Sequence, residues 1–249
     1  MFLKNYSVQL AKDILIRAPR RMGRMSSYVR EFRSFVAQND DRFQVSYKDA
    51  YPCLSDKLET TPFDQHYIYH PAWAARILAQ TKPASHVDFS SILSFASIIS
   101  AFIPVKFYDY RPAQLQLDNW QSDFADLTNL SFVDGEFNSV SCMHTVEHIG
   151  LGRYGDALDA KGDIKAINEL QRVTIEGGDI LFVTPVGRQR IEFNAHRIYG
   201  YDLVLEMFNN CTLQEFSLVP DSGGLVRNAN PAIVAQQEYG CGCFWFKKN

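Results

Sequence analysis

The spacing of apolar positions changes near His86, and from there strand-like and helix-like segments alternate. Short connections between such segments are typical of a doubly wound α/β sheet. The last two strand-like segments alternate apolar and polar residues, which favours an antiparallel C-terminal strand on a mostly parallel sheet. The expected strands are 86–89, 105–109, 139–144, 179–184, 212–219 and 243–247, and the expected helices are 92–102, 163–173 and 201–208.

The segment before His86 has a different pattern, with helical pieces joined by turn-rich stretches. We therefore predict a helical N-terminal extension over residues 1–84 and an α/β domain over residues 85–249. The first 35 residues are basic and carry an apolar stripe, so they either contact an anionic membrane surface or pack as an arm on the protein itself. Breaks in the stripe at Pro19 and Gly23 favour packing. The basic residues are Lys4, Lys12, Arg17, Arg20, Arg21, Arg24, Arg30 and Arg33.

Composition narrows the functional classes. A hydrophobic fraction of 46% and a charged fraction of 21% are ordinary for a globular protein, and a net charge of −3 does not favour nucleic-acid binding. The chain contains no long apolar span and no signal-peptide core. Its five scattered cysteines do not form a disulfide framework, which predicts reduced thiols and a cytoplasmic protein, with the basic segment as a candidate contact to the inner face of the membrane. Cys241 and Cys243 lack the usual zinc or redox spacing, so no metal site is predicted.

Ionisable side chains gather between residues 139 and 173, where a buried strand gives way to a loop. Open α/β sheets place their binding sites at such strand ends. His144, Glu147 and His148 form an H-x-x-E-H pattern, which binds zinc only when a helix presents both histidines on one face. The strand before His144 and the glycines after His148 argue against that helix and therefore against a zinc hydrolase.

A second pattern, G-x-G-x-x-G, spans residues 150–155. A dinucleotide site needs a helix directly after the glycines, whereas the next helix is expected only at about Asp163. A dehydrogenase is therefore not favoured. Arg153 and the loop amides could instead hold a phosphate of a substrate.

A third pattern extends over two thirds of the chain. Its segments are VDFSS (87–91), FYDYRP (107–112), SVSCMHTVEHIGLGRYGD (139–156), KAINELQRV (165–173), GGDILFVTPVG (177–187), FNAHRI (193–198) and YGCGCFWFKK (239–248). With these segments the chain resembles the class I S-adenosylmethionine-dependent methyltransferases, which have a Rossmann-like sheet. Through the long central segment and FNAHRI it resembles a family of methyltransferase-like proteins that is often associated with surface-glycan genes.

The resemblance implies an S-adenosylmethionine site at the ends of the first strands. Asp109, 21 residues after Asp88, occupies the position of the acidic residue that accepts both ribose hydroxyls. Asp123 and Asp126 remain alternatives for the adenine edge. The first loop has serines where the family has glycines, and its Ile92 and Leu93 leave less room for the cofactor. The candidate cofactor-binding residues are Asp88, Ser90, Asp109, Asp123, Asp126 and His144.

A methyltransferase of this kind aligns its acceptor and removes a proton from it, while the cofactor supplies the methyl group. Histidine suits the proton transfer because it titrates near neutrality, and arginines can hold an acidic acceptor such as a sugar phosphate. The expected acceptor is a surface glycan or a sugar phosphate. The candidate catalytic residues are Glu147, His148, Arg153, Asp156, His196 and Arg197.

Two alternatives remain, because a fold does not determine a function. The glycine-free first loop also fits an enzyme that has lost S-adenosylmethionine use and performs another glycan transfer, such as glycosyl transfer. A non-catalytic module of a glycan-assembly complex is the other alternative. Such a module would not need His148, Arg153, Asp156 and His196 to converge on one pocket.

Overall fold

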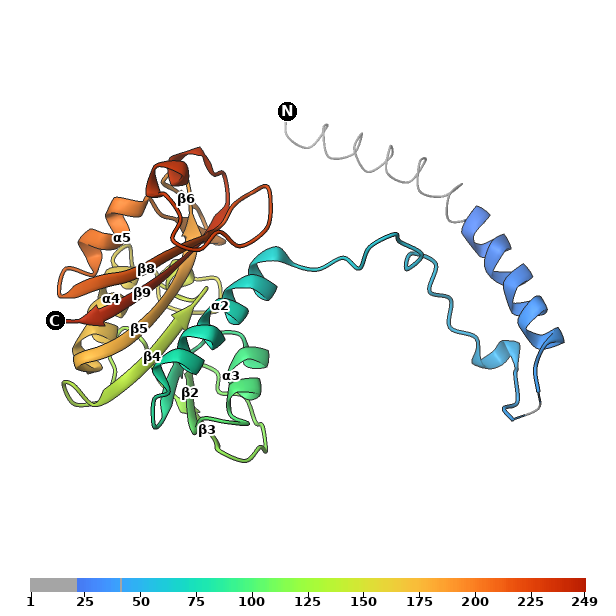
Figure 1. The fold of residues 1–249 in the computed structure, drawn as a ribbon, viewed down its shortest axis with the longest axis horizontal. Coiled ribbons are helices and arrows are strands. Elements are labelled where there is room, and N and C mark those ends of the chain that lie inside the picture. The colour runs from blue at the N-terminus through green and yellow to red at the C-terminus, as the bar shows by residue number, and fades with distance from the viewer. Residues whose placement is uncertain (1–21, 41) are drawn as a thin grey trace. The chain divides into compact units, whose positions relative to one another are not determined.

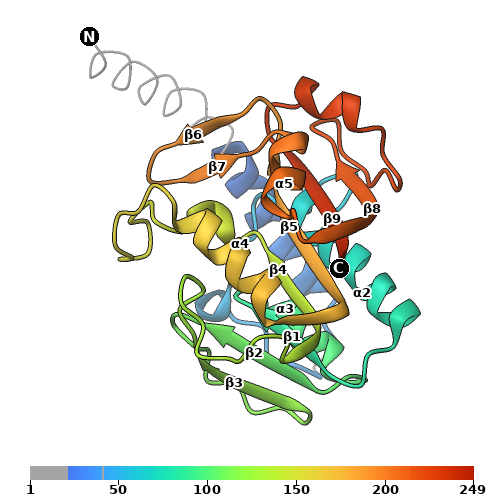
Figure 2. The same cartoon turned by 90° about the vertical axis from the view of Figure 1, so that its left-hand side faces the viewer.

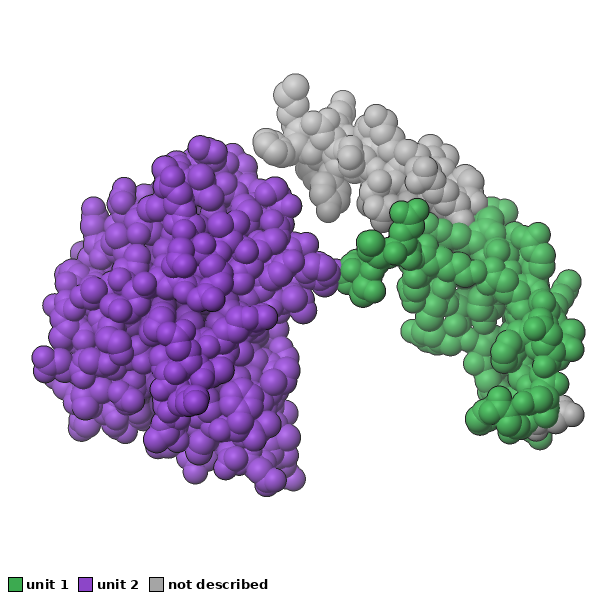
Figure 3. All heavy atoms as spheres, in the orientation of Figure 1, with its two compact units in different colours: residues 1–62 green, residues 63–249 purple. Residues whose placement is uncertain are grey.

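The computed structural model describes residues 22–40 and 42–249. The chain divides into two compact units, residues 1–62 and residues 63–249 (Figure 3). This division lies earlier than the boundary expected after residue 84, because helix α2 (Gln65–Thr81) belongs to the second unit. Trp73 and Ile77 of α2 are buried in an apolar core that also contains strand residues of the sheet.

The first unit contains a helix over residues 22–37 and the short turn η1 (Tyr47–Asp49). The ring of Phe32 contacts that of Tyr47 at a centroid distance of 5.3 Å, and Lys57 Nζ donates to Glu31 at 2.6 Å. None of the helices in the described part of the chain is long and apolar enough to cross a membrane. Five of the basic residues on which the membrane alternative rests lie outside the described residues: Lys4, Lys12, Arg17, Arg20 and Arg21.

The second unit is built on a seven-stranded sheet with the order β3-β2-β1-β4-β5-β9-β8 (Figures 1 and 2). Strand β9 runs antiparallel to both of its neighbours, and the remaining pairs are parallel. The expected doubly wound sheet with an antiparallel C-terminal strand is therefore confirmed. The strands are β1 (His86–Phe89), β2 (Val105–Asp109), β3 (Trp120–Phe124), β4 (Phe137–Met143), β5 (Thr174–Val186), β8 (Cys211–Val219) and β9 (Gly240–Lys248).

Helices cover both faces of the sheet (Figure 2). Helices α2 and α3 (Leu93–Ile99) pack on one face, and α4 (Gly162–Val173) and α5 (Tyr201–Met207) pack on the other. Each pair of helices contributes to its own apolar core. The central strands are consequently buried on both sides. In β5 this burial corresponds to the apolar run 180–183, whereas β1 and β4 also bury polar side chains.

Several elements differ from the expectation. Strand β3 was not predicted, because its polar, largely exposed side chains do not form an apolar run. The hairpin of β6 (Arg190–Glu192) and β7 (His196–Ile198) is too short for a periodic signal. Helix α3 begins after Ile92 and has no side-chain cap, and the preceding Ser91 Oγ accepts a hydrogen bond from the amide of Met143.

A ladder of buried polar side chains joins β1 to β4. The two ring nitrogens of His86 each lie 2.8 Å from a serine hydroxyl, Nδ1 from Ser139 and Nε2 from Ser141. Ser141 donates to Asp88, which also accepts from the amide of Ser91 at 2.9 Å. Because the Ser141 hydroxyl donates to Asp88, His86 Nε2 must donate to Ser141. Burial raises the pKa of Asp88 to about 6, although these hydrogen bonds oppose the shift.

The raised pKa of Asp88 predicts a pH-dependent stability. Between about pH 4 and 6 the folded chain binds more protons at this residue than the unfolded chain. The contribution of Asp88 to the free energy of unfolding is therefore greatest below pH 4 and declines as the pH rises through 6, by roughly 2–3 kcal/mol. Asp88→Asn should lack this decline in chemical denaturation measured from pH 4 to 7.

The exposed Asp123 provides the control, because Asp123→Asn should retain the wild-type pH dependence. If the free energy of unfolding changed with pH in the same way in the wild type and in Asp88→Asn, the raised pKa of the buried Asp88 would be contradicted.

Candidate functional site

A cavity of about 360 Å³ lies beyond the carboxyl ends of the parallel strands. The strand order places β2 and β4 on opposite sides of β1, so the winding of the sheet reverses between β1 and β4. Ligands of open α/β sheets bind in the crevice at such a reversal. Each of the four neighbouring strand ends contributes one sequence-predicted residue to the lining: Ser90, Asp109, Asp126 and His144.

The first loop adopts the backbone conformation that glycine favours, although it contains no glycine. Ser90 has φ +57°. Its amide donates to Tyr108 O at 2.8 Å, and its carbonyl accepts from Thr145 Oγ1 at 2.9 Å. Ile92 packs against the core beneath α2 and α3, Leu93 is 38% exposed, and neither lines the cavity. The two apolar side chains therefore do not fill the space as the sequence suggested.

Two carboxylates line the side of the cavity formed by β2 and β3. Asp109 Oδ1 accepts from the amide of Arg111 at 2.6 Å, and Asp126 Oδ1 accepts from the amide and hydroxyl of Thr128. Asp123 is exposed on β3 and does not line the cavity, so Asp126 is the one of the two alternatives that faces it. Asp88 belongs to the buried ladder and not to the lining.

The opposite side of the cavity is formed by the segment after β4. His144 has φ +56°, and its Nδ1 lies 2.9 Å from Oε1 of the buried Glu147. His148 lines the cavity and donates from Nδ1 to the carbonyl oxygen of Ala195 at 2.6 Å, which leaves Nε2 as an acceptor. Burial lowers the pKa of His148, so the imidazole is neutral at pH 7. His148 is the last residue of η2 (Val146–His148) and His144 precedes this element, which is a 3-10 turn and not the α-helix that a zinc hydrolase needs.

The glycine-rich loop closes on its own aspartate. Asp156 accepts from the amides of Gly150 at 2.7 Å, Gly152 at 3.3 Å and Tyr154 at 3.2 Å. Burial acts to raise the pKa of Asp156, but these amides outweigh it and lower the pKa. The suggestion that the loop amides hold a substrate phosphate is therefore wrong, because a carboxylate of the chain already occupies them.

The two arginines of the candidate set are engaged with the backbone. Arg153 donates to Ala195 O at 3.1 Å, and its guanidinium lies 5.1 Å from the ring centroid of Tyr154. Arg197 is buried and donates to Ile149 O at 2.6 Å, with its Nε 3.4 Å from Asp163. Neither arginine lines the cavity.

The sequence-predicted residues thus divide into two groups. Those that line the cavity are Ser90, Asp109, Asp126, His144, His148 and Asp156. Those outside its lining are Asp88, Asp123, Glu147, Arg153, His196 and Arg197.

Sequence reasoning did not select Tyr110 and Arg111, which directly follow β2 and also line the cavity. The Arg111 guanidinium lies 4.8 Å from the ring centroid of Tyr154, another lining residue. The sequence feature that could have identified these two residues is an aromatic residue followed by an arginine at the end of a strand.

Comparisons with known proteins agree with the topology. Residues 115–217 match a family described as "Caenorhabditis protein of unknown function, DUF268". No curated protein matches the sequence.

Three solved structures, of one methyltransferase and two methyltransferase candidates, are similar to this chain at low sequence identity. A methyltransferase candidate from Bacillus halodurans C-125 is 13% identical with a TM-score of 0.50, over 72% of this chain and 98% of that one. A sarcosine dimethylglycine methyltransferase candidate from Galdieria sulphuraria is 14% identical with a TM-score of 0.51, over 72% and 85%. The 1,6-didemethyltoxoflavin-N1-methyltransferase of Burkholderia thailandensis, with S-adenosylhomocysteine bound, is 11% identical with a TM-score of 0.51, over 73% and 79%.

These likenesses define the class of the fold. The α/β unit of this chain has the Rossmann-like fold of the class I S-adenosylmethionine-dependent methyltransferases.

The packing of the glycine-rich loop predicts unequal effects of two similar substitutions. Gly150 and Gly155 both have positive φ, so alanine costs about 1 kcal/mol of backbone strain at either position. A Cβ at Gly150 would also lie 2.0 Å from Asp159 O, whereas a Cβ at Gly155 meets no atom within 4 Å among the described residues. Gly150→Ala should therefore destabilise the protein by at least about 2 kcal/mol more than Gly155→Ala in urea denaturation. Equal losses would show that the loop does not pack on Asp159.

Proposed function

We propose that this protein is an S-adenosylmethionine-dependent methyltransferase acting on a sugar or surface-glycan acceptor. The observation that carries the proposal is the cavity at the reversal of the sheet, lined by Ser90, Asp109 and Asp126 from three successive strand ends. Its volume of about 360 Å³ lies in the range of small-molecule sites. The Burkholderia enzyme, which has S-adenosylhomocysteine bound, shares the fold in which this cavity lies.

The lining residues fit the cofactor. The Asp109 carboxylate at the end of β2 would accept the two ribose hydroxyls, and Asp126 would lie at the adenine edge with Leu127 beside the ring. The left-handed backbone at Ser90 turns the first loop as a glycine would, so its main chain can approach the amino-acid part of the cofactor. The bound cofactor would supply an activated methyl group on its sulfonium.

The remaining wall fits an acceptor with hydroxyl groups. His148, neutral and with Nε2 available to accept, would take the proton of the attacking hydroxyl. Tyr154 is 44% exposed and lies against Arg111, which provides an aromatic face and a cation for a sugar ring with an acidic group.

The surroundings of His148 favour an enzyme over a non-catalytic module. Asp156 lines the same cavity, Arg153 Nη1 lies 3.3 Å from His148 Nδ1, and the His196 ring centroid is 6.3 Å from that of His148. His148 and Asp156 converge on the cavity, as an enzyme requires, whereas Arg153 and His196 do not line it.

A methyltransferase-fold enzyme without S-adenosylmethionine is the second candidate, because a serine side chain occupies the left-handed position next to the cavity. In that case the same cavity would hold a nucleotide sugar or sugar phosphate, and the reaction would be another glycan transfer, such as glycosyl transfer.

Calorimetric titration with S-adenosylhomocysteine tests the proposal on the wild type, Asp109→Ala and Asp123→Ala. The wild type should bind with a Kd on the order of micromolar. Asp109→Ala should weaken binding about 10- to 100-fold, because two hydrogen bonds to a charged group are lost. Asp123→Ala, which removes an exposed carboxylate from the neighbouring strand, should bind like the wild type.

No binding by the wild type at millimolar ligand would exclude the cofactor assignment. Titration with nucleotide sugars would then test the second candidate. Equal weakening by the two substitutions would place the ligand elsewhere.

A further inference from the structure

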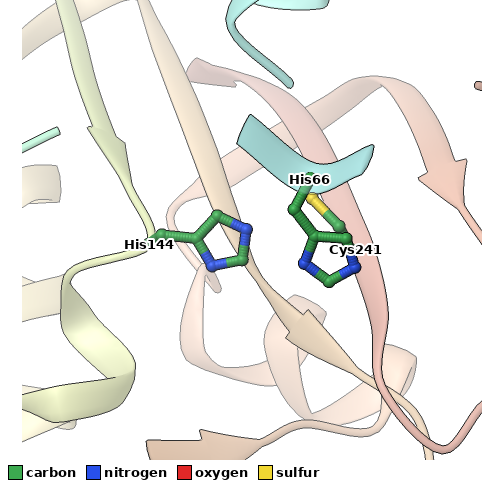
Figure 4. Close-up of side chains that lie close together, drawn as sticks. All are labelled: His66, His144 and Cys241. Carbon is green, nitrogen blue, oxygen red and sulfur yellow. The ribbon is translucent and has the colours of Figure 1, made fainter. Parts of the chain in front are cut away.

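Three potential metal ligands from distant parts of the sequence lie together in the second unit. They are His66 in the first turn of α2, His144 after β4, and Cys241 on β9 (Figure 4). One ligand atom of each lies within 4.8 Å of those of the other two. The imidazole rings of His66 and His144 are nearly parallel, with centroids 5.4 Å apart.

The hydrogen bonding of His144 leaves its second nitrogen available. Nδ1 lies 2.9 Å from Oε1 of Glu147, and a carboxylate only accepts, so Nδ1 carries the proton. Nε2 therefore has a free lone pair, yet it is buried and has no hydrogen-bond partner among the described residues. Metal-binding histidines characteristically donate their other nitrogen to a carboxylate in this way, which fixes the tautomer and the ring orientation.

We propose that His66, His144 and Cys241 bind a zinc ion. Two imidazole nitrogens and one thiolate match the borderline-soft preference of Zn²⁺. Zinc–nitrogen and zinc–sulfur bond lengths place tetrahedral ligand atoms about 3.3–3.6 Å apart, so the three groups must close by about 1 Å. On binding, the Cys241 thiol loses its proton to solvent and its sulfur donates an electron pair to the metal.

Three protein ligands leave the fourth tetrahedral position for a water or a ligand oxygen, as in catalytic zinc sites. Of the three ligands, His144 is the one that also lines the cavity. The metal site stands on these three residues and does not depend on the cofactor assignment. Their separation in the sequence explains why ligand spacing did not reveal the site.

Cobalt binding by the metal-free full-length protein tests the site, because Co²⁺ occupies zinc sites and its thiolate complexes have a charge-transfer band. The wild type should bind one equivalent with this band and with the intense visible bands of a tetrahedral site, and Zn²⁺ should abolish both. Cys241→Ser should lose the thiolate band and weaken Co²⁺ binding at least tenfold. His66→Gln, at a partly exposed position, should keep the thiolate band at saturation and weaken binding by a similar factor.

Cys243 provides the matched control. It is buried on the same face of β9, with its Sγ 3.9 Å from that of Cys241, and it is not one of the three ligands. Cys243→Ser should therefore retain the wild-type spectrum and affinity, and far-ultraviolet circular dichroism should show that each variant is folded. Lack of Co²⁺ binding by the wild type, binding without a thiolate band, or the same loss in Cys243→Ser as in Cys241→Ser would overturn the proposal.

Discussion

The arrangement of the site depends on the buried polar ladder between β1 and β4. The reversal of winding at these two strands opens the crevice. A fully hydrogen-bonded polar network allows only one alignment of the two strands, whereas apolar packing alone would tolerate several. Ser141 donates to Asp88, and Asp88 accepts from the amide of Ser91. The ladder therefore reaches the first loop, where Ser91 also accepts from the amide of Met143. The residues on either side of the crevice are placed by the same set of bonds.

The second wall of the cavity is organised without a ligand. A glycine-rich loop at a strand end commonly binds an anion, but here the Asp156 carboxylate takes the place of that anion. Arg197 holds the two ends of the loop through the carbonyls of Ile149 and Asp159. A wall that is already ordered saves the entropy of ordering it on binding. The loop is thus part of the scaffold around His148 rather than a phosphate site.

The sequence predicted the parts of the molecule that follow from periodicity. Buried strands and the helices between them have strong apolar signals. Asp109 and His144, selected by the rule that sites lie at strand ends, line the cavity. Asp123 and Asp126 could not be separated, because a shift of a few residues at a strand end decides whether a side chain faces the cavity. The backbone contacts of Arg197 and the approach of Cys241 to His144 depend on tertiary structure alone.

The buried Glu147 contacts His144, which belongs both to the cavity lining and to the proposed zinc site. Its carboxylate is 1% exposed, and Oε2 has no hydrogen-bond partner in the described part of the chain. A buried carboxyl group needs hydrogen bonds or an opposite charge, and the contact with His144 Nδ1 satisfies only Oε1. A Zn²⁺ ion bound to one thiolate would retain one positive charge, and its attraction would stabilise a carboxylate that is hydrogen-bonded to its ligand His144.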